Sequence, residues 1–143
     1  MMGLTLTKDV LTDFGYTIRS EEVDLSNSNI SDIDIDAFEE YEQLKKVNLS
    51  GNSIEFVDRG TFAQNARLTD VVLANNRLRS FSAEVFGPDS SIEVLDLSGN
   101  PLESFDVSLT EVLSLQTLNL DNTGVASRVQ LKRVGRRLHA TLA

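Results

Sequence analysis

One stretch of this 143-residue sequence has acids at a spacing that could suggest a metal site. Asp32, Asp34 and Asp36 alternate there with isoleucines. A calcium loop directs several oxygens at one centre, usually with a glycine at its bend and a distal glutamate. Because isoleucines intervene and no glycine follows, a solvated acidic edge is the favoured interpretation, and we predict no metal site.

Residues that could perform catalysis are few. His139 is the single histidine, and the chain has no cysteine. A catalytic triad or a histidine-ligated metal needs partner side chains that the basic segment around His139 does not offer. The lack of cysteine removes disulfides, a thiolate nucleophile and cysteine-ligated metals. We therefore expect no catalytic residue, no cofactor and no enzymatic activity.

Two tripeptides, Asn29-Ile30-Ser31 and Asn48-Leu49-Ser50, match the acceptor pattern for N-glycosylation. The pattern matters for a secreted chain. It also arises often by coincidence in repeats rich in asparagine and serine, and a coincidental match is the favoured interpretation.

Charge is distributed unevenly along the chain. All 22 acidic residues precede residue 126, together with 8 basic residues. The last 18 residues contain no acid and five basic residues: Arg128, Lys132, Arg133, Arg136 and Arg137. An acidic body repels nucleic acid and anionic lipid and attracts basic partners. The basic run 132–137 fits a nuclear-import or phosphate-binding patch, but we favour a capping helix whose cations complement the helix end.

Neither a membrane span nor a signal peptide is expected. No run of apolar residues is long enough to cross a bilayer as a helix. The first ten residues lack a basic start and a continuous apolar core, because Lys8 and Asp9 interrupt them.

One repeated pattern organises most of the sequence. Leu44, Val47, Leu49, Asn52 and Ile54 read as L-x-x-L-x-L-x-x-N-x-L, and the same frame returns from residues 68, 92 and 115. A degenerate copy begins at Val23. The first apolar residues of the four copies are thus 24, 24 and 23 residues apart, within the period of leucine-rich-repeat solenoids.

The 24-residue form, with its Thr61-Phe62 or Ala37-Phe38 step, resembles the typical subclass of leucine-rich repeats. Toll-like receptors, Slit proteins, small proteoglycans and insect immune proteins carry that subclass. The resemblance implies an α/β repeat solenoid, a right-handed horseshoe with a parallel sheet on its concave face. It also implies an extracellular location, possibly as a fragment, whereas the missing signal and cysteines favour the cytoplasm.

Within each repeat, alternation predicts a short strand with two interior side chains. The predicted interior pairs are Val23/Leu25, Val47/Leu49, Val71/Leu73, Leu95/Leu97 and Leu118/Leu120. Asn52, Asn76 and Asn100 follow the strands, where buried amides can bond the backbone of adjacent turns as a ladder. Pairs five residues apart predict the core of the return leg: Ile33/Phe38, Val57/Phe62 and Phe81/Phe86.

Three parts are expected along the chain: an N-terminal cap (1–22), five repeats (23–125) and a basic C-terminal cap or tail (126–143). A solenoid's first turn needs a cover for its apolar end, and we predict a short strand at 16–19 within it. We also predict a short helix at about 110–115. For the tail, a capping helix is favoured over a sixth strand starting near Leu138 and over a segment that pairs with another chain.

The concave face is the expected binding surface of this architecture. Its outward positions hold five acids against one lysine, with a small apolar patch in the middle. The predicted partner-binding residues are Asp24, Lys46, Asn48, Asp70, Val72, Val94, Asp96, Asn119 and Asp121. We therefore predict a protein-interaction module for a partner with a basic surface, in innate immune recognition or adhesion. The alternative is an assembly module that forms a homodimer through its tail or an open sheet edge.

Overall fold

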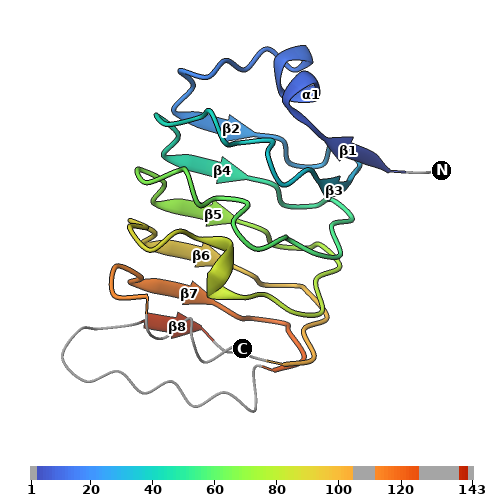
Figure 1. The fold of residues 1–143 in the computed structure, drawn as a ribbon. Coiled ribbons are helices and arrows are strands. Elements are labelled where there is room, and N and C mark those ends of the chain that lie inside the picture. The colour runs from blue at the N-terminus through green and yellow to red at the C-terminus, as the bar shows by residue number, and fades with distance from the viewer. Residues whose placement is uncertain (1–2, 105–111, 126–138, 142–143) are drawn as a thin grey trace.

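The structure, a computed structural model, describes residues 3–104, 112–125 and 139–141. It is a parallel-sheet solenoid of about five turns, as the repeat predicts (Figure 1). Each turn contributes one short strand to a six-stranded parallel sheet. In spatial order the strands are β2 (Glu22–Asp24), β4 (Lys46–Asn48), β5 (Asp70–Val72), β6 (Val94–Asp96), β7 (Thr117–Asn119) and β8 (His139–Thr141).

The strands pair in register, so equivalent positions of successive turns form columns across the sheet. Val23, Val47, Val71, Leu95 and Leu118 are paired in this way, and each is at most 1% exposed. Successive side chains of a strand point to opposite faces, so the residues on either side of this column face outward. All of the predicted interior pairs are buried.

The return legs fill the other half of the core with aromatic rings. Phe38, Phe62 and Phe86 lie one above another, with ring centroids 5.3 and 6.2 Å apart. A 3-10 helix, η1 (Ala83–Val85), precedes Phe86. The predicted return-leg pairs are all buried, so the five-residue spacing identified this half of the core correctly.

The N-terminal segment packs on the flank of the first turn. Strand β1 (Leu4–Leu6) pairs with β3 (Ile30–Ile33), and helix α1 (Lys8–Asp13) follows it with Thr7 as its N-cap. The predicted strand at 16–19 is wrong, because this stretch forms turns. Gly15 has a φ of +96°, and the Ser20 hydroxyl accepts a hydrogen bond from the Thr17 N–H at 3.0 Å. Such local bonds compete with pairing in a sheet.

Two predicted helices also differ from the structure. Of the helix predicted at 110–115, residues 110–111 lie outside the described residues and 112–115 form a turn, closed by the Leu115 N–H on the Val112 carbonyl. In the tail, residues 139–141 form strand β8 rather than helix, because the edge of β7 offers a parallel partner. The rest of the predicted capping helix, with the basic run 132–137, lies outside the described residues.

Candidate functional site

Buried asparagines join successive turns beneath the sheet. The Asn52 Oδ1 accepts from the N–H groups of Ser28 and Ile30 at 2.9 and 3.0 Å, while its Nδ2 donates to the carbonyls of Leu25 and Leu49. Asn76 and Asn100 repeat this arrangement one and two turns later. At the two ends, the hydroxyls of Ser28 and Thr123 donate to carbonyls of their own turns.

The edge at the carboxyl ends of the strands alternates asparagine and glycine. Every residue there has a left-handed φ between 51° and 70°: Asn27, Gly51, Asn75, Gly99 and Asn122. A Cβ on Gly51 would lie 2.0 Å from the Asn27 Oδ1, and one on Gly99 would lie 2.1 Å from the Asn75 Oδ1. The glycines thus make room for the amides of the preceding turns. Sequence reasoning missed this column, although the 24-residue spacing contains it.

On the concave face, the last residue of four of the strands is a polar side chain that accepts hydrogen bonds from the residue two positions later. The Oδ1 of Asp24, Asn48 and Asp96 accepts from both the N–H and the hydroxyl of the serine two residues later, at 2.6 to 3.0 Å. The Asn119 Oδ1 accepts from the Asp121 N–H at 2.9 Å. These bonds favour the charged form, so the two bonds from Ser26 lower the pKa of Asp24. We refer to Asp24, Asn48, Asp96 and Asn119 as the capped column.

The centre of the face lies on β5 and β6, where the capped column is interrupted. Val72 pairs with Asp96, and Asp70 pairs with Val94, so valines and acids occupy opposite diagonals. Ala74, the residue equivalent to the capping serines, is 7% exposed. One column further out, Lys46 stands between Glu22 and Asp70. The structure therefore brings the predicted partner-binding residues onto one face, with a small apolar centre among acids.

The free edge of β2 is closed by Tyr16. Its hydroxyl accepts from the Asp24 N–H at 3.0 Å and donates to the Asp24 carbonyl at 2.9 Å. Unpaired backbone groups at a sheet edge are a template for another strand. At Asp24 that template is occupied, which disfavours the assembly alternative at this end of the sheet.

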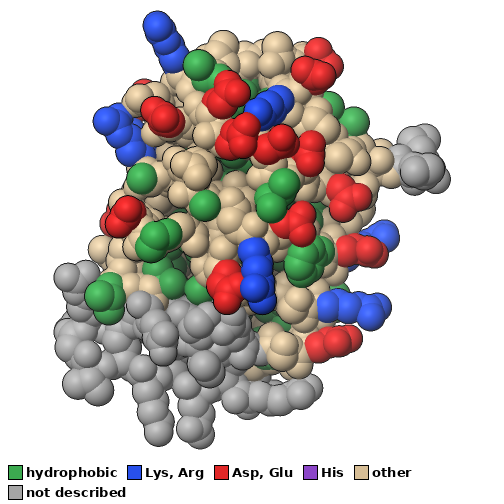
Figure 2. Space-filling view, in the orientation of Figure 1, with side chains coloured by type: hydrophobic (Ala, Val, Ile, Leu, Met, Phe, Trp, Pro, Cys, Tyr) green, Lys and Arg blue, Asp and Glu red, His purple; other side chains and the backbone are tan. Residues whose placement is uncertain are grey.

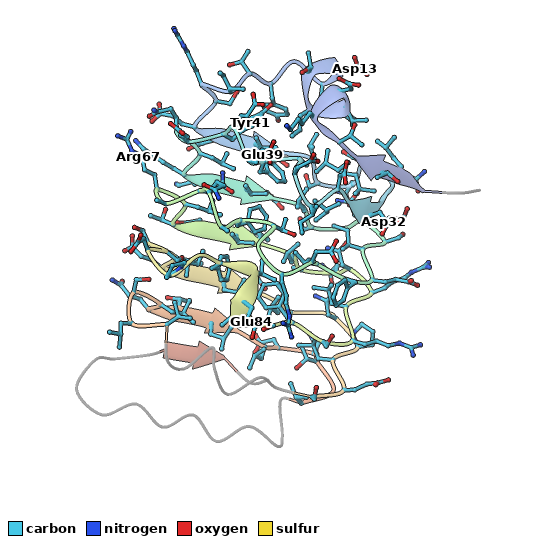
Figure 3. The ribbon with its side chains drawn as sticks, viewed as in Figure 1. Asp13, Asp32, Glu39, Tyr41, Arg67 and Glu84 are labelled. Carbon is cyan, nitrogen blue, oxygen red and sulfur yellow. The ribbon has the colours of Figure 1, made fainter. Side chains whose placement is uncertain are left out.

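The remaining candidates are spread over the molecule. Asp32 lies on β3, outside the six-stranded sheet (Figure 3), and, like Asp34, is exposed. The described residues contain no group of three or more histidine, cysteine or acidic side chains placed to hold a metal. Asn29 is exposed, while Asn48 is half-buried in the capped column. The backbone of His139 lies in β8.

In the described part of the chain, no helix could cross a membrane.

The opposite, return-leg surface has a different character. Acidic side chains gather over α1 and the first return leg (Figure 2), where Lys8 forms ion pairs with Glu39 and Glu40. Glu84 lies in η1, in the middle of this surface, and Arg67 lies at the amino ends of the strands (Figure 3). These two surfaces present separate sets of side chains.

A family model described as leucine rich repeat matches residues 21–78 and 66–125, and the chain belongs to this family. The match covers the turns that carry the asparagine ladder and the capped column. No curated protein sequence matches this chain significantly.

Solved structures of similar fold include the APL1 leucine-rich repeat domain, 26% identical with a TM-score of 0.72 over 83% of this chain and 31% of that one. A TLR13–ssRNA13 complex is 26% identical with a TM-score of 0.60, over 71% and 15% of the respective chains. The Drosophila melanogaster SNF/U2A′ complex is 25% identical with a TM-score of 0.68, over 87% and 73%. The chain thus spans about a third of the APL1 chain and resembles Toll-like and insect immune leucine-rich-repeat domains. This fold indicates a protein-interaction module.

Proposed function

We propose that the protein is a non-catalytic module that binds a protein partner with a basic surface through its concave face. The observation that carries this proposal is the capped column: two carboxylates and two amides, each fixed by hydrogen bonding from the residue two positions later in the same turn. Binding normally costs the conformational freedom of interface side chains. These side chains have lost much of that freedom before a partner arrives.

The charge of the face selects the partner. Asp24 and Asp96 use Oδ1 for the capping bonds, which leaves Oδ2 as an acceptor for a lysine or arginine. Glu22, Asp70 and Asp121 add three more carboxylates against Lys46. Complementary charge speeds association and suppresses wrong partners, and an acidic face repels the phosphates of nucleic acid. RNA is named in the TLR13 complex, but the charge of this face favours a protein.

The relatives suggest the setting. The similarity to APL1 and TLR13 supports recognition in innate immunity, with adhesion as the second setting. Since this chain spans a fraction of either structure, the partners of those proteins are not assigned to it.

The test is affinity capture of partners from an extract of the source organism, followed by mass spectrometry. Asp24→Asn with Asp96→Asn removes two charges but keeps the Oδ1 acceptors, as Asn48 and Asn119 do in the neighbouring turns. Val72→Arg places a bulky cation at the apolar centre of the concave face. Asp32→Asn, on β3 and outside the six-stranded sheet, is the control for the loss of an exposed carboxylate.

We expect a basic partner that the wild type and the Asp32→Asn variant retain and that both concave variants lose. Retention of the same proteins by all four chains would refute the concave face as the binding site. If an acidic protein or a nucleic acid is retained by the wild type and Asp32→Asn but lost by both concave variants, the concave face remains the binding site. The proposed preference for a basic partner is then refuted.

A further inference from the structure

A groove of about 320 Å³ crosses three turns on the return-leg side, away from the concave face. Its lining combines apolar side chains, serines and one arginine: Phe56, Val57, Arg59, Ser80, Phe81, Ser82, Val85 and Ser104. One lining residue, Val85, lies in η1, the 3-10 helix that also contains Glu84 (Figure 3). We call this depression the Phe56 groove.

Phe56 is the anomalous residue of the groove. It is 54% exposed, although a phenylalanine contributes most when it is buried. The repeat places Asp32, Ser80 and Ser104 at the equivalent positions of the other turns. Folding therefore does not need an aromatic side chain at this position, and the exposed ring is available for contact with another molecule.

Apolar side chains form the floor of the groove. Val57, Phe81 and Val85 are 6%, 7% and 1% exposed, and the Phe81 ring packs against Phe86 with their centroids 6.0 Å apart. The floor is thus part of the rigid core, and Phe56 forms a wall above it. A bulky apolar side chain that entered the groove would be in contact with both.

Arg59 is the single ionisable residue among the described lining residues. Its Nε donates to Glu84 at 2.7 Å, and the two side chains are 82% and 56% exposed. An exposed pair of this kind contributes little stability, and the guanidinium has further donors for a second carboxylate. Arg77 and Arg79 line a neighbouring depression with Glu55, and Arg79 pairs with Glu103 at 3.8 Å, so Arg59 is the cation that the groove itself presents.

We propose that the Phe56 groove docks a segment of a partner protein that presents a bulky apolar side chain beside a carboxylate. The apolar side chain lies on Val57, Phe81 and Val85 against Phe56, and the carboxylate accepts from Arg59. This site is independent of the concave face, because that face attracts basic segments and this groove binds an acidic one.

The experiment selects a phage-displayed library of random heptapeptides on three forms of the chain: wild type, Phe56→Ser and Phe14→Ser. Serine occupies the equivalent position in two other turns, so we expect the Phe56→Ser variant to fold, and its thermal unfolding checks this. Phe14 is 49% exposed in the N-terminal segment, outside the groove, and its variant controls for the loss of an exposed phenylalanine. Enriched peptides are then synthesised and titrated.

We expect peptides with leucine, isoleucine or an aromatic residue next to aspartate or glutamate, bound by the wild type and by Phe14→Ser. Phe56→Ser weakens them by about tenfold or more, since the removed ring is a large apolar contact. Arg59→Gln weakens them roughly twofold to fivefold, less at high salt. Basic peptides, or equal enrichment on Phe56→Ser, would overturn the proposal. Self-association of the wild type that Phe56→Ser abolishes would overturn it too, because the occupant is then a second copy.

Discussion

The concave face and the return-leg flank are built from the same repeats but obey different rules. On the concave face the strands are in register, so a useful side chain recurs every turn and forms a column. On the flank the chain turns without a continuous sheet, and one residue can differ from its equivalents, as Phe56 does from Ser80 and Ser104. Regular pairing of the strands thus repeats one type of side chain across the concave face. The irregular return legs allow one turn to carry a side chain that the other turns lack.

The difference also appears in what the two regions tolerate. Beneath the concave face, a buried amide satisfies backbone groups in two turns at once. The Phe56 groove depends on exposed side chains that the fold does not require. Substitutions in the ladder should therefore cost stability, and substitutions in the groove should not.

The largest expected effect comes from Asn76→Leu. It leaves the Ile54 N–H without its partner inside the core and removes one of the two amide donors from each of the carbonyls of Leu49 and Leu73, which keep Asn52 and Asn100 respectively. We expect a loss of about 3 kcal/mol or more in the free energy of unfolding, because unpaired buried groups are costly. Urea denaturation followed by circular dichroism measures it.

Thr123→Val at the equivalent position of a later turn is the control. The Thr123 hydroxyl bonds the Leu120 carbonyl of its own turn, so we expect a loss of about 1 kcal/mol or less. Equal losses for the two variants would mean that the ladder does not couple turns.

The second prediction concerns the asparagine–glycine edge. Gly51→Ala places a Cβ 2.0 Å from the Asn27 Oδ1 in a residue with φ of +70°. We expect about 1 to 3 kcal/mol of destabilisation from the strained backbone and the clash together. Adding Asn27→Gly removes the clash but not the backbone strain, so it should recover part of the loss in the same denaturation assay. Full recovery would show that the backbone carries no strain there.

A smaller effect is expected from Tyr16→Phe, which removes both hydroxyl bonds to the Asp24 backbone. The site is exposed, so we expect a loss of about 1 kcal/mol. The opened edge of β2 should also raise the tendency to self-associate, which light scattering at increasing concentration detects. A variant that stays monomeric and as stable as the wild type would show that the hydroxyl does not protect the edge.

The smallest effect is a dependence on pH at Asp24. The bonds from Ser26 lower the pKa of this carboxyl below its value of 3.8 in the unfolded chain, so the stability that they contribute is present above that value. It is lost as the pH falls through the lower, folded pKa. A carbon-detected NMR titration should give a pKa below 3.8, and Asp24→Asn should flatten the acid limb of the stability curve. A measured pKa at or above 3.8 would contradict the capping.

Much of the fold could be predicted because the repeat encodes it locally. The 24-residue spacing of the leucines identified the strands, the interior pairs and the phenylalanines of the return leg. The positions of Asn52, Asn76 and Asn100 followed from the same frame, as did the side chains of the concave face. Each depends on hydrophobic periodicity and on a position within one turn, and both are readable from a single sequence.

Other features depend on contacts between turns, which only the tertiary structure decided. Strand β1 is three residues long and pairs with β3, a partner that no local pattern specifies. The Tyr16 hydroxyl closes the edge at Asp24 because a turn, rather than the predicted strand, places it there. The Phe56 groove needs three turns side by side. The sequence by itself determined the repeating unit, because the pattern of each unit is local. The tertiary structure decided the contacts between turns, because these contacts join residues that lie far apart in the chain.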